Sequence, residues 1–178
     1  MVWLAEDEPR PEALKTGFRP RKRIFTVFFN TRGPVVVDIT PDKATVTTTY
    51  YTTSVLPNVL LHNQSTARTR RRSRIQLHHD NAAPHKARNT QTYLDDNGIR
   101  LMEHPPQSPD LASCDFWLFP KFKSALAGKP FSRTQDLAKA VHSDMRAIPD
   151  SEYRECFQKW RMRMQRCIEV EGRCFEAM

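Results

Sequence analysis

The sequence lacks any apolar run close to the length of about 18 residues at which a membrane-spanning helix is expected. Residues 1–10 are acidic and do not form a basic leader followed by an apolar segment. No Cys-x-x-Cys pair, internal repeat or low-complexity segment occurs, and three of the four cysteines cluster near the C-terminus at helix-like spacing. We therefore expect no membrane partner, no secretion, and reduced thiols in a nuclear or cytosolic protein.

Length and composition then bound the fold. A chain of 178 residues and 20.7 kDa is long enough for one domain with a hydrophobic core plus a helical appendage. Charged residues make up 27% of the chain and hydrophobic residues 39%, which is typical of a folded protein. The net charge of +8 and the pI near 9.6 favour an anionic partner, most commonly nucleic acid.

The first third of the chain predicts a strand pair. Residues 24–30 and 35–39 are rich in β-branched and aromatic residues, and a Gly-Pro turn joins them. The Thr-rich residues 45–56 favour a strand by propensity, but their position after a strand pair suggests a crossover helix. Residues 61–74 are polar and basic, which predicts an exposed loop. Its arginines, candidates for sequence-independent contact with phosphates, are Arg68, Arg70, Arg71, Arg72 and Arg74.

The middle of the chain predicts a strand, a helix and a second strand. Residues 75–79 form a short apolar run, residues 84–96 read as a helix with proline in its first turn, and residues 99–104 read as a strand. Asn97-Gly98 marks the end of the helix. The three prolines that follow, at positions 105, 106 and 109, predict an extended connection, since proline interrupts both helices and central strands.

The last third predicts helices. We expect a short turn at residues 113–119 and a helix at 120–127. Ser132 and Gln135 form a candidate capping box for a helix ending near residue 147. A further helix starts at Pro149-Asp150. The apolar stripe that we expect to face the core on this helix comprises Tyr153, Cys156, Phe157, Trp160, Met164, Cys167 and Ile168.

Two motifs carry chemistry. The first is the segment LHHDNAAPH at residues 77–85, and the second is HPPQSPDLASCD at residues 104–115. Asp80 follows a predicted strand, and Asp115 precedes a predicted helix, so the two carboxylates can converge on one site. Mg²⁺ prefers a few carboxylates with water and phosphate oxygens, and phosphodiester transfer uses two such cations roughly 3.5–4 Å apart.

These motifs resemble those of mariner transposases, in the Tc1/mariner superfamily. That family carries HDNAxxH at a strand end, a proline-rich PHPPYSPDLAPxD motif, and a fixed spacing between its second and third catalytic acids. Asp80 and Asp115, with positions 81–114 between them, have this same spacing. Family-like text continues in residues 116–119, 128–131 and 160–175, so the resemblance runs from about residue 3 to residue 175.

The resemblance implies an α/β, ribonuclease-H-like fold, truncated at its N-terminus, with a mixed sheet flanked by helices and with C-terminal helices. Residues 1–127 would form the transposase domain, and residues 128–178 its helical extension. Asp80 and Asp115 would be catalytic ligands of Mg²⁺ or Mn²⁺, and DNA the partner in the nucleus. His85 would lie near the DNA backbone or the metal site. A homodimer or a full-length transposase is a further expected partner.

The resemblance also implies missing parts. The family's helix-turn-helix modules and first catalytic Asp would precede Met1, so we expect no complete cut-and-paste transposition from this chain, and nicking at best. Sequence-specific DNA binding is not expected either, because those modules read the base edges. The alternative function is a non-catalytic nucleic-acid-binding or transposase-interacting protein.

Each candidate residue has a structural alternative. Asp80 could cap the helix that begins near Pro84, and Asp110 is a rival to Asp115 within the proline-rich motif. The spacing shared with the family selects Asp115. The histidines His78, His79 and His85 could suggest zinc, but no cysteine or further histidine lies at ligand spacing.

Overall fold

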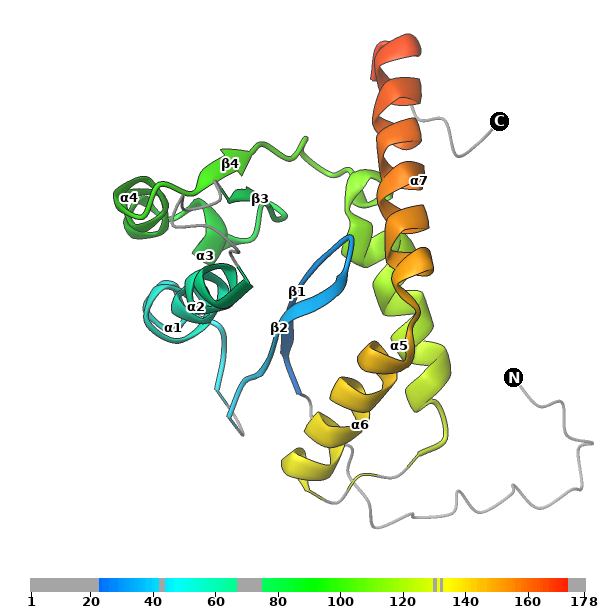
Figure 1. Cartoon of the computed structure of the whole chain (residues 1–178). Helices are drawn as coiled ribbons and strands as arrows, with labels where there is room; N and C mark the ends of the chain where they lie inside the picture. The colour runs from blue at the N-terminus through cyan, green and yellow to red at the C-terminus, as the bar shows by residue number, and fades with distance from the viewer. Residues whose placement is uncertain (1–22, 42–43, 67–74, 130, 132, 173–178) are drawn as a thin grey trace, which may run out of the picture.

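The computed structural model describes residues 23–41, 44–66, 75–129, 131 and 133–172 (Figure 1). The elements of the first half are β1 (Phe25–Asn30), β2 (Gly33–Ile39), α1 (Thr48–Tyr50), η1 (Tyr51–Val55), α2 (Leu56–Thr66), β3 (Gln76–His78), α3 (Ala83–Lys86), α4 (Arg88–Asp96) and β4 (Arg100–Met102). Those of the second half are η2 (Pro109–Leu111), η3 (Cys114–Leu118), α5 (Phe119–Leu126), α6 (Thr134–Ala147) and α7 (Asp150–Glu169). None of the described helices is both long and apolar enough to cross a membrane.

The predicted strand pair is confirmed as the antiparallel hairpin β1–β2. Its turn is at Thr31-Arg32, where the Asn30 side chain accepts a hydrogen bond from the Arg32 amide. Gly33 opens β2 with φ at +122°, a conformation that favours glycine because other residues have a Cβ. The two strands of the hairpin keep one pairing register apart from a bulge between Phe28 and Phe29.

The Thr-rich segment is helical, as its position suggested, and propensity was the misleading signal. Thr47 caps α1 by accepting a hydrogen bond from the Tyr50 amide, and the hydroxyls of Thr52 and Thr53 bond back to carbonyls one turn earlier. Tyr51 and Val55 are fully buried, so packing outweighs the strand propensity of threonine. The expectation of a loop from residue 61 was wrong at its start, because α2 continues to Thr66.

The predicted strand–helix–strand unit is present, with β3 parallel to β4. The helix predicted over residues 84–96 is broken into α3 and α4, however, because Ala87 is extended with φ −60° and ψ +140°. The buried hydroxyl of Thr90 donates a hydrogen bond to the Pro84 carbonyl across this break. This bond satisfies a carbonyl at the end of α3, where helical hydrogen bonding stops. The predicted stop at Asn97-Gly98 is confirmed, with Gly98 at φ +65°.

The C-terminal helices follow the predicted order, with one correction. The N-cap of α6 is Arg133, which makes no side-chain cap bond. Ser132, on which the expected capping box depends, lies outside the described residues. The stripe on α7 is buried at Tyr153, Cys156 and Trp160, but Ile168 is 71% exposed. The C-terminal end of α7 extends past the other described helices and strands, so none of the described core lies against it (Figure 1).

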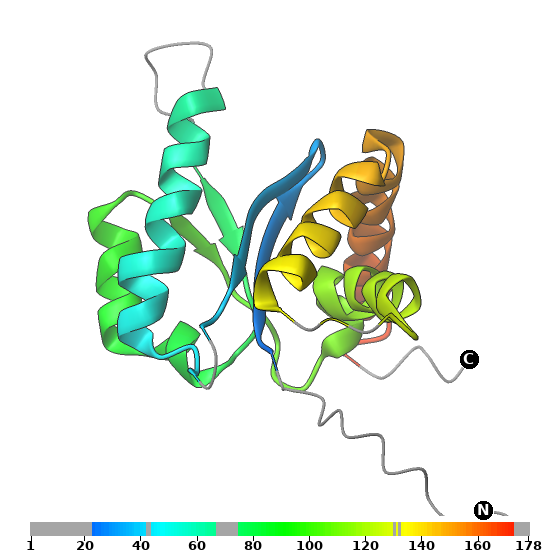
Figure 2. The same cartoon turned by 90° about the horizontal axis from the view of Figure 1, so that it is seen from below.

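The α/β class is confirmed, but the described strands form two separate two-stranded sheets rather than one mixed sheet. Figure 2 shows the hairpin between two groups of helices, with α1 and α2 on one side and α5–α7 on the other. One face of β1 contributes Phe28 to the first core, and the alternate residues Phe25, Val27 and Phe29 reach the second. The first core is centred on Tyr51, Val55, Leu56, Leu77, Leu94 and Ile99. The second is centred on Leu118, Phe122, Val141 and Met145.

Candidate metal and nucleic-acid site

Asp80 and Asp115 line the same cleft. Asp80 lies two residues after β3, and Asp115 lies in the first turn of η3. The cleft has a volume of about 400 Å³, and residues 24–28 of the hairpin form a further wall of it. Both aspartates are exposed, so their side chains are accessible to a ligand entering the cleft. Asp110, the alternative to Asp115 in the proline-rich motif, does not line the cleft. Its backbone carbonyl accepts a hydrogen bond from Arg163.

The two carboxylates have opposite pKa shifts. The pKa of Asp80 falls from 3.8 to about 2, chiefly because its side chain accepts a hydrogen bond from His85, with a further contribution from the Ala82 amide. The pKa of Asp115 is raised by burial and by the negative charge of Asp80. Asp80 therefore ionises first and opposes the ionisation of Asp115, and a cation between them would relieve that repulsion.

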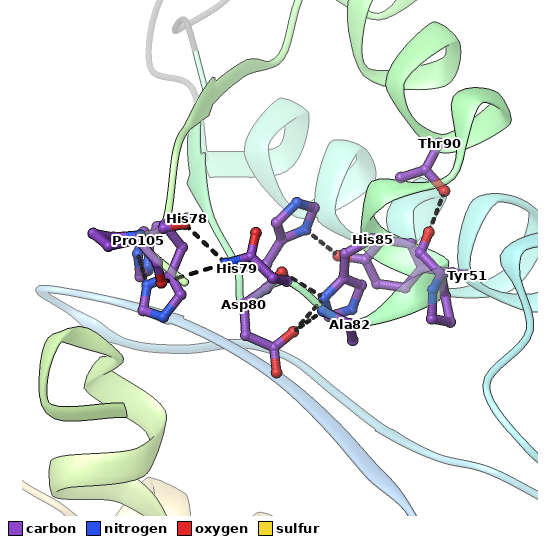
Figure 3. A network of polar contacts seen from close by, with 11 residues as sticks. Tyr51, His78, His79, Asp80, Ala82, His85, Thr90 and Pro105 are labelled. Carbon is purple, nitrogen blue, oxygen red and sulfur yellow. Dashed lines mark hydrogen bonds and ion pairs between the residues drawn. The ribbon is translucent and has the colours of Figure 1, made fainter. Parts of the chain in front are cut away.

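An aromatic stack lies behind Asp80 (Figure 3). His85 Nδ1 is 2.7 Å from Asp80 Oδ1, and the His85 ring lies parallel to the His79 ring with centroids 4.4 Å apart. The His85 ring also contacts Tyr51, with centroids 4.6 Å apart, and the Tyr51 hydroxyl is 3.0 Å from His79 Nδ1. The structure thus places His85 against Asp80, while its contact with DNA stays a prediction.

A second histidine pair joins the two motifs. His78 Nε2 is 3.1 Å from His104 Nδ1, and the Asn81 side chain donates to the His104 carbonyl at 2.8 Å. The His78 ring also packs against Trp160, whose indole N–H donates to the Leu111 carbonyl. Sequence reasoning missed these connections, although both histidines stand inside the two motifs. They hold the proline-rich segment, and with it η3 and Asp115, against the end of β3.

Burial keeps two of these histidines uncharged. The pKa of His78 is lowered to about 4 by burial and by His104, and that of His79 to about 4 by burial and by His85. At neutral pH neither ring carries a positive charge, so neither neutralises Asp80. Of the three histidines near Asp80, His85 is therefore the one paired with its carboxylate.

The donor set suits a hard cation that also binds water. Among the residues that the structure describes, no group of three or more His, Cys, Asp or Glu side chains is arranged to hold a metal ion. Two carboxylates facing one cleft still fit Mg²⁺ or Mn²⁺, because these ions complete their coordination with water and phosphate oxygens. The five arginines predicted to contact phosphates, at positions 68, 70, 71, 72 and 74, lie outside the described residues.

Comparison with known proteins finds one family model and two curated relatives. The family model described as "Transposase (partial DDE domain)" matches residues 1–75. The chain is 27% identical over 175 residues to the histone-lysine N-methyltransferase SETMAR of Homo sapiens, covering 98% of this chain and 25% of that protein. It is 26% identical over 157 residues to the Mariner Mos1 transposase of Drosophila mauritiana, covering 88% of this chain and 46% of that protein.

Solved structures extend the likeness to the fold. The crystal structure of the catalytic domain of Mos1 mariner transposase matches with a TM-score of 0.81 at 26% identity, over 89% of this chain and 78% of that one. The structure of the Mos1 catalytic domain and Raltegravir with Mn matches with a TM-score of 0.79 at 25% identity, over 88% of this chain and 82% of that one. The chain spans a quarter of SETMAR and about half of the Mos1 transposase.

Proposed function

We propose, on the premise that this chain is a partial catalytic domain of the mariner transposase type, that Asp80 and Asp115 hold a divalent cation for phosphodiester cleavage in DNA. The observation that carries this proposal is that both carboxylates line one cleft, where burial and the charge of Asp80 raise the pKa of Asp115. Mos1 catalytic-domain structures with Mn and with Mg support the choice of cation.

The residues of the proposed site would have different roles in cleavage. Asp80 and Asp115 bind the cation, and the His78–His104 pair keeps the segment carrying Asp115 against β3. When bound, Mg²⁺ or Mn²⁺ supplies charge stabilisation at the phosphate and lowers the pKa of an attacking water. His78 and His79 line the same cleft, and their lowered pKa values leave them uncharged beside Asp80 at neutral pH.

DNA is the proposed substrate and the nucleus the proposed location. The net charge of +8 supports an anionic partner, and a Mos1 transposase paired-end complex with the left transposon end is among the structures that share this fold. The described part of the chain adds a basic surface on α7. Exposed Arg154 and Arg161, seven residues apart, line a shallow hollow of about 590 Å³ together with Gln158 and Thr31.

The arginines of this surface are available to phosphates. Seven residues correspond to about two turns of helix, or roughly 10 Å. The nearby acids Glu152 and Glu155 pair with Lys121 and Lys159, so they do not neutralise the arginines. Thr31 follows β1, whose residues 24–28 line the cleft of the aspartates, so one strand connects the two surfaces. We propose that a DNA backbone bound at the cleft extends onto this hollow.

Cleavage is tested by incubating the purified 178-residue chain with supercoiled plasmid in Mg²⁺ and, separately, in Mn²⁺. We expect slow conversion to nicked circles, faster in Mn²⁺ because its geometric demands are softer, and loss of nicking in Asp80→Ala. Asp110→Ala is the matched control and should nick like the unchanged chain. Equal nicking by Asp80→Ala and the unchanged chain would contradict the proposal.

A second function is favoured by one observation. Since no third acid joins Asp80 and Asp115 among the described residues, the chain could serve as a non-catalytic DNA-binding protein or as a partner of a second copy or a full-length transposase. Retained DNA binding with no nicking in either metal would select this function over cleavage.

The DNA-binding surface gives a separate prediction. Replacing Arg154 and Arg161 with alanine should weaken binding to random and transposon-end duplexes alike, because phosphate contacts carry no sequence information. The slope of log affinity against log salt should fall by roughly 1 for each arginine that no longer meets a phosphate. Fluorescence anisotropy at several salt concentrations measures both quantities.

The matched control for this surface is Lys139→Ala with Arg146→Ala, which removes the same charge from exposed positions on α6. A variant with alanine at all five arginines between residues 68 and 74 forms a further arm. If the α7 variant binds like the control, or weakens binding to one sequence only, the proposed surface is wrong.

A further inference from the structure

We propose that His85 is a positioning residue that orients Asp80 toward the cation, and that His79 and Tyr51 fix the His85 ring for this task. The inference rests on the proposed function, because it assumes that Asp80 is a metal ligand. It goes beyond that function by assigning a role to the stack beside the carboxylate, whereas the sequence placed His85 only near the DNA backbone or the metal site, without a role.

The two carboxylate oxygens of Asp80 differ in their hydrogen bonds. Oδ1 accepts from His85 Nδ1 at 2.7 Å and from the Ala82 amide at 3.0 Å. Among the residues drawn in Figure 3, no dashed line reaches the other carboxylate oxygen of Asp80. With Oδ1 held by two donors, the carboxylate has one orientation, and Oδ2 is left for a cation. Histidine partners of this kind commonly fix the direction of a ligand and tune its affinity.

The ring of His85 is itself held from two sides. The His79 ring lies parallel to it, with an interplanar angle of 5°, and the Tyr51 ring lies 4.6 Å away. Tyr51 is fully buried in the first core, and its hydroxyl contacts His79 Nδ1. The core therefore determines the position of His85.

The turn at Asp80 does not explain this stack. An aspartate that bonds to the amide two residues later is a common local turn, and it needs no histidine. The additional bond from His85 crosses from Asp80 into α3, and the parallel stacking on His79 serves neither the turn nor the helix. A positioning role accounts for both features, because each limits where Oδ1 and hence Oδ2 can lie.

The test measures Mn²⁺ binding to the full 178-residue chain by electron paramagnetic resonance and titration calorimetry. His85→Ala removes donor and ring, His85→Phe keeps a stacking ring without the donor, and His85→Asn keeps a donor near Nδ1 without the ring. We expect about tenfold weaker binding for His85→Ala and His85→Phe, and recovery of most of this loss in His85→Asn. His142→Ala, at an exposed position on α6, is the control and should not change affinity.

Circular dichroism checks that each variant is folded. His85→Phe keeps a stacking ring, so a loss of affinity in this variant is not explained by a missing ring. Wild-type affinity in His85→Phe, or equal losses in all three variants, would overturn the positioning role because the donor would then be irrelevant. Asp80→Asn distinguishes the two levels of inference. If it binds Mn²⁺ normally, the proposed function fails; if it loses Mn²⁺ while His85→Ala does not, only the positioning role fails.

Discussion

Replacing either Asp80 or Asp115 with asparagine is expected to weaken Mn²⁺ binding by roughly 100-fold, because each supplies one of two anionic ligands and cation affinity depends on ligand charge. Without metal, the two substitutions should act in opposite directions. Hydrogen bonds from His85 and the Ala82 amide favour the charged form of Asp80, so Asp80→Asn should lower the free energy of unfolding. Burial and the charge of Asp80 disfavour the charged form of Asp115, so Asp115→Asn should raise it.

The pH dependence follows from the same shifts. The pKa of Asp80 is depressed to about 2, so its contribution to stability is present above its unfolded value of 3.8 and is lost as the pH falls toward 2. The pKa of Asp115 is raised, so its ionised form costs stability at higher pH, and this cost disappears as the pH falls through the folded pKa. Asp115→Asn should remove that second component from the pH profile.

Urea unfolding in EDTA across pH, together with calorimetric Mn²⁺ titration, measures both effects. Asp110→Asn is the matched control, since Asp110 lies in the same motif but does not line the cleft. It should leave Mn²⁺ affinity unchanged. Stability changes of the same sign for the two site variants, or an equal loss of Mn²⁺ in the control, would show that the two carboxylates do not form a shared cation site.

The second large effect concerns the core that joins the hairpin to the C-terminal helices. Leu118 is fully buried with Phe122, Val141 and Met145, and these residues come from η3, α5 and α6. Leu118→Ala should cost about 3 kcal/mol, the midrange for a buried leucine that leaves a cavity. For a domain of this size the melting temperature should then fall by roughly 6–12 °C.

This substitution also tests the division of the chain at residue 127, which stays a prediction. Because the second core contains residues on both sides of that position, we expect one cooperative transition for the whole chain. Leu61→Ala, at a position 59% exposed, is the control and should change stability by no more than about 0.5 kcal/mol. A loss below about 1 kcal/mol for Leu118→Ala, or a separate early transition of the C-terminal helices, would contradict a shared core.

Much of the architecture could be predicted because local patterns and packing agree. The hairpin follows from two β-branched runs around a short turn, and the β3–β4 unit follows from a strand, a proline-started helix and an Asn-Gly stop. The placement of Asp80 and Asp115 in one cleft also agrees with the expected convergence of the two motifs. In these segments the sequence period and the buried face match.

Other features depend on contacts between distant residues, which local patterns do not encode. Thr47–Thr53 form a helix because Tyr51 and Val55 reach a core built largely from later residues. The break at Ala87 is accompanied by a hydrogen bond between Thr90 and Pro84 that no periodicity predicts. His85 was expected near the DNA backbone or the metal site, but the sequence did not predict its contact with Tyr51, which comes from a helix much earlier in the chain. At the C-terminal end of α7, the predicted apolar stripe includes Ile168, which is 71% exposed among the described residues.

The most direct test of the central claim is a crystal of the 178-residue chain soaked in Mn²⁺ and measured at the manganese absorption edge. We expect an anomalous peak in the cleft, with oxygens of both Asp80 and Asp115 about 2 Å from the ion and with Oδ1 of Asp80 still bonded to His85. A peak on the histidines alone, or a cleft without any peak at saturating Mn²⁺, would contradict a cation shared by the two aspartates.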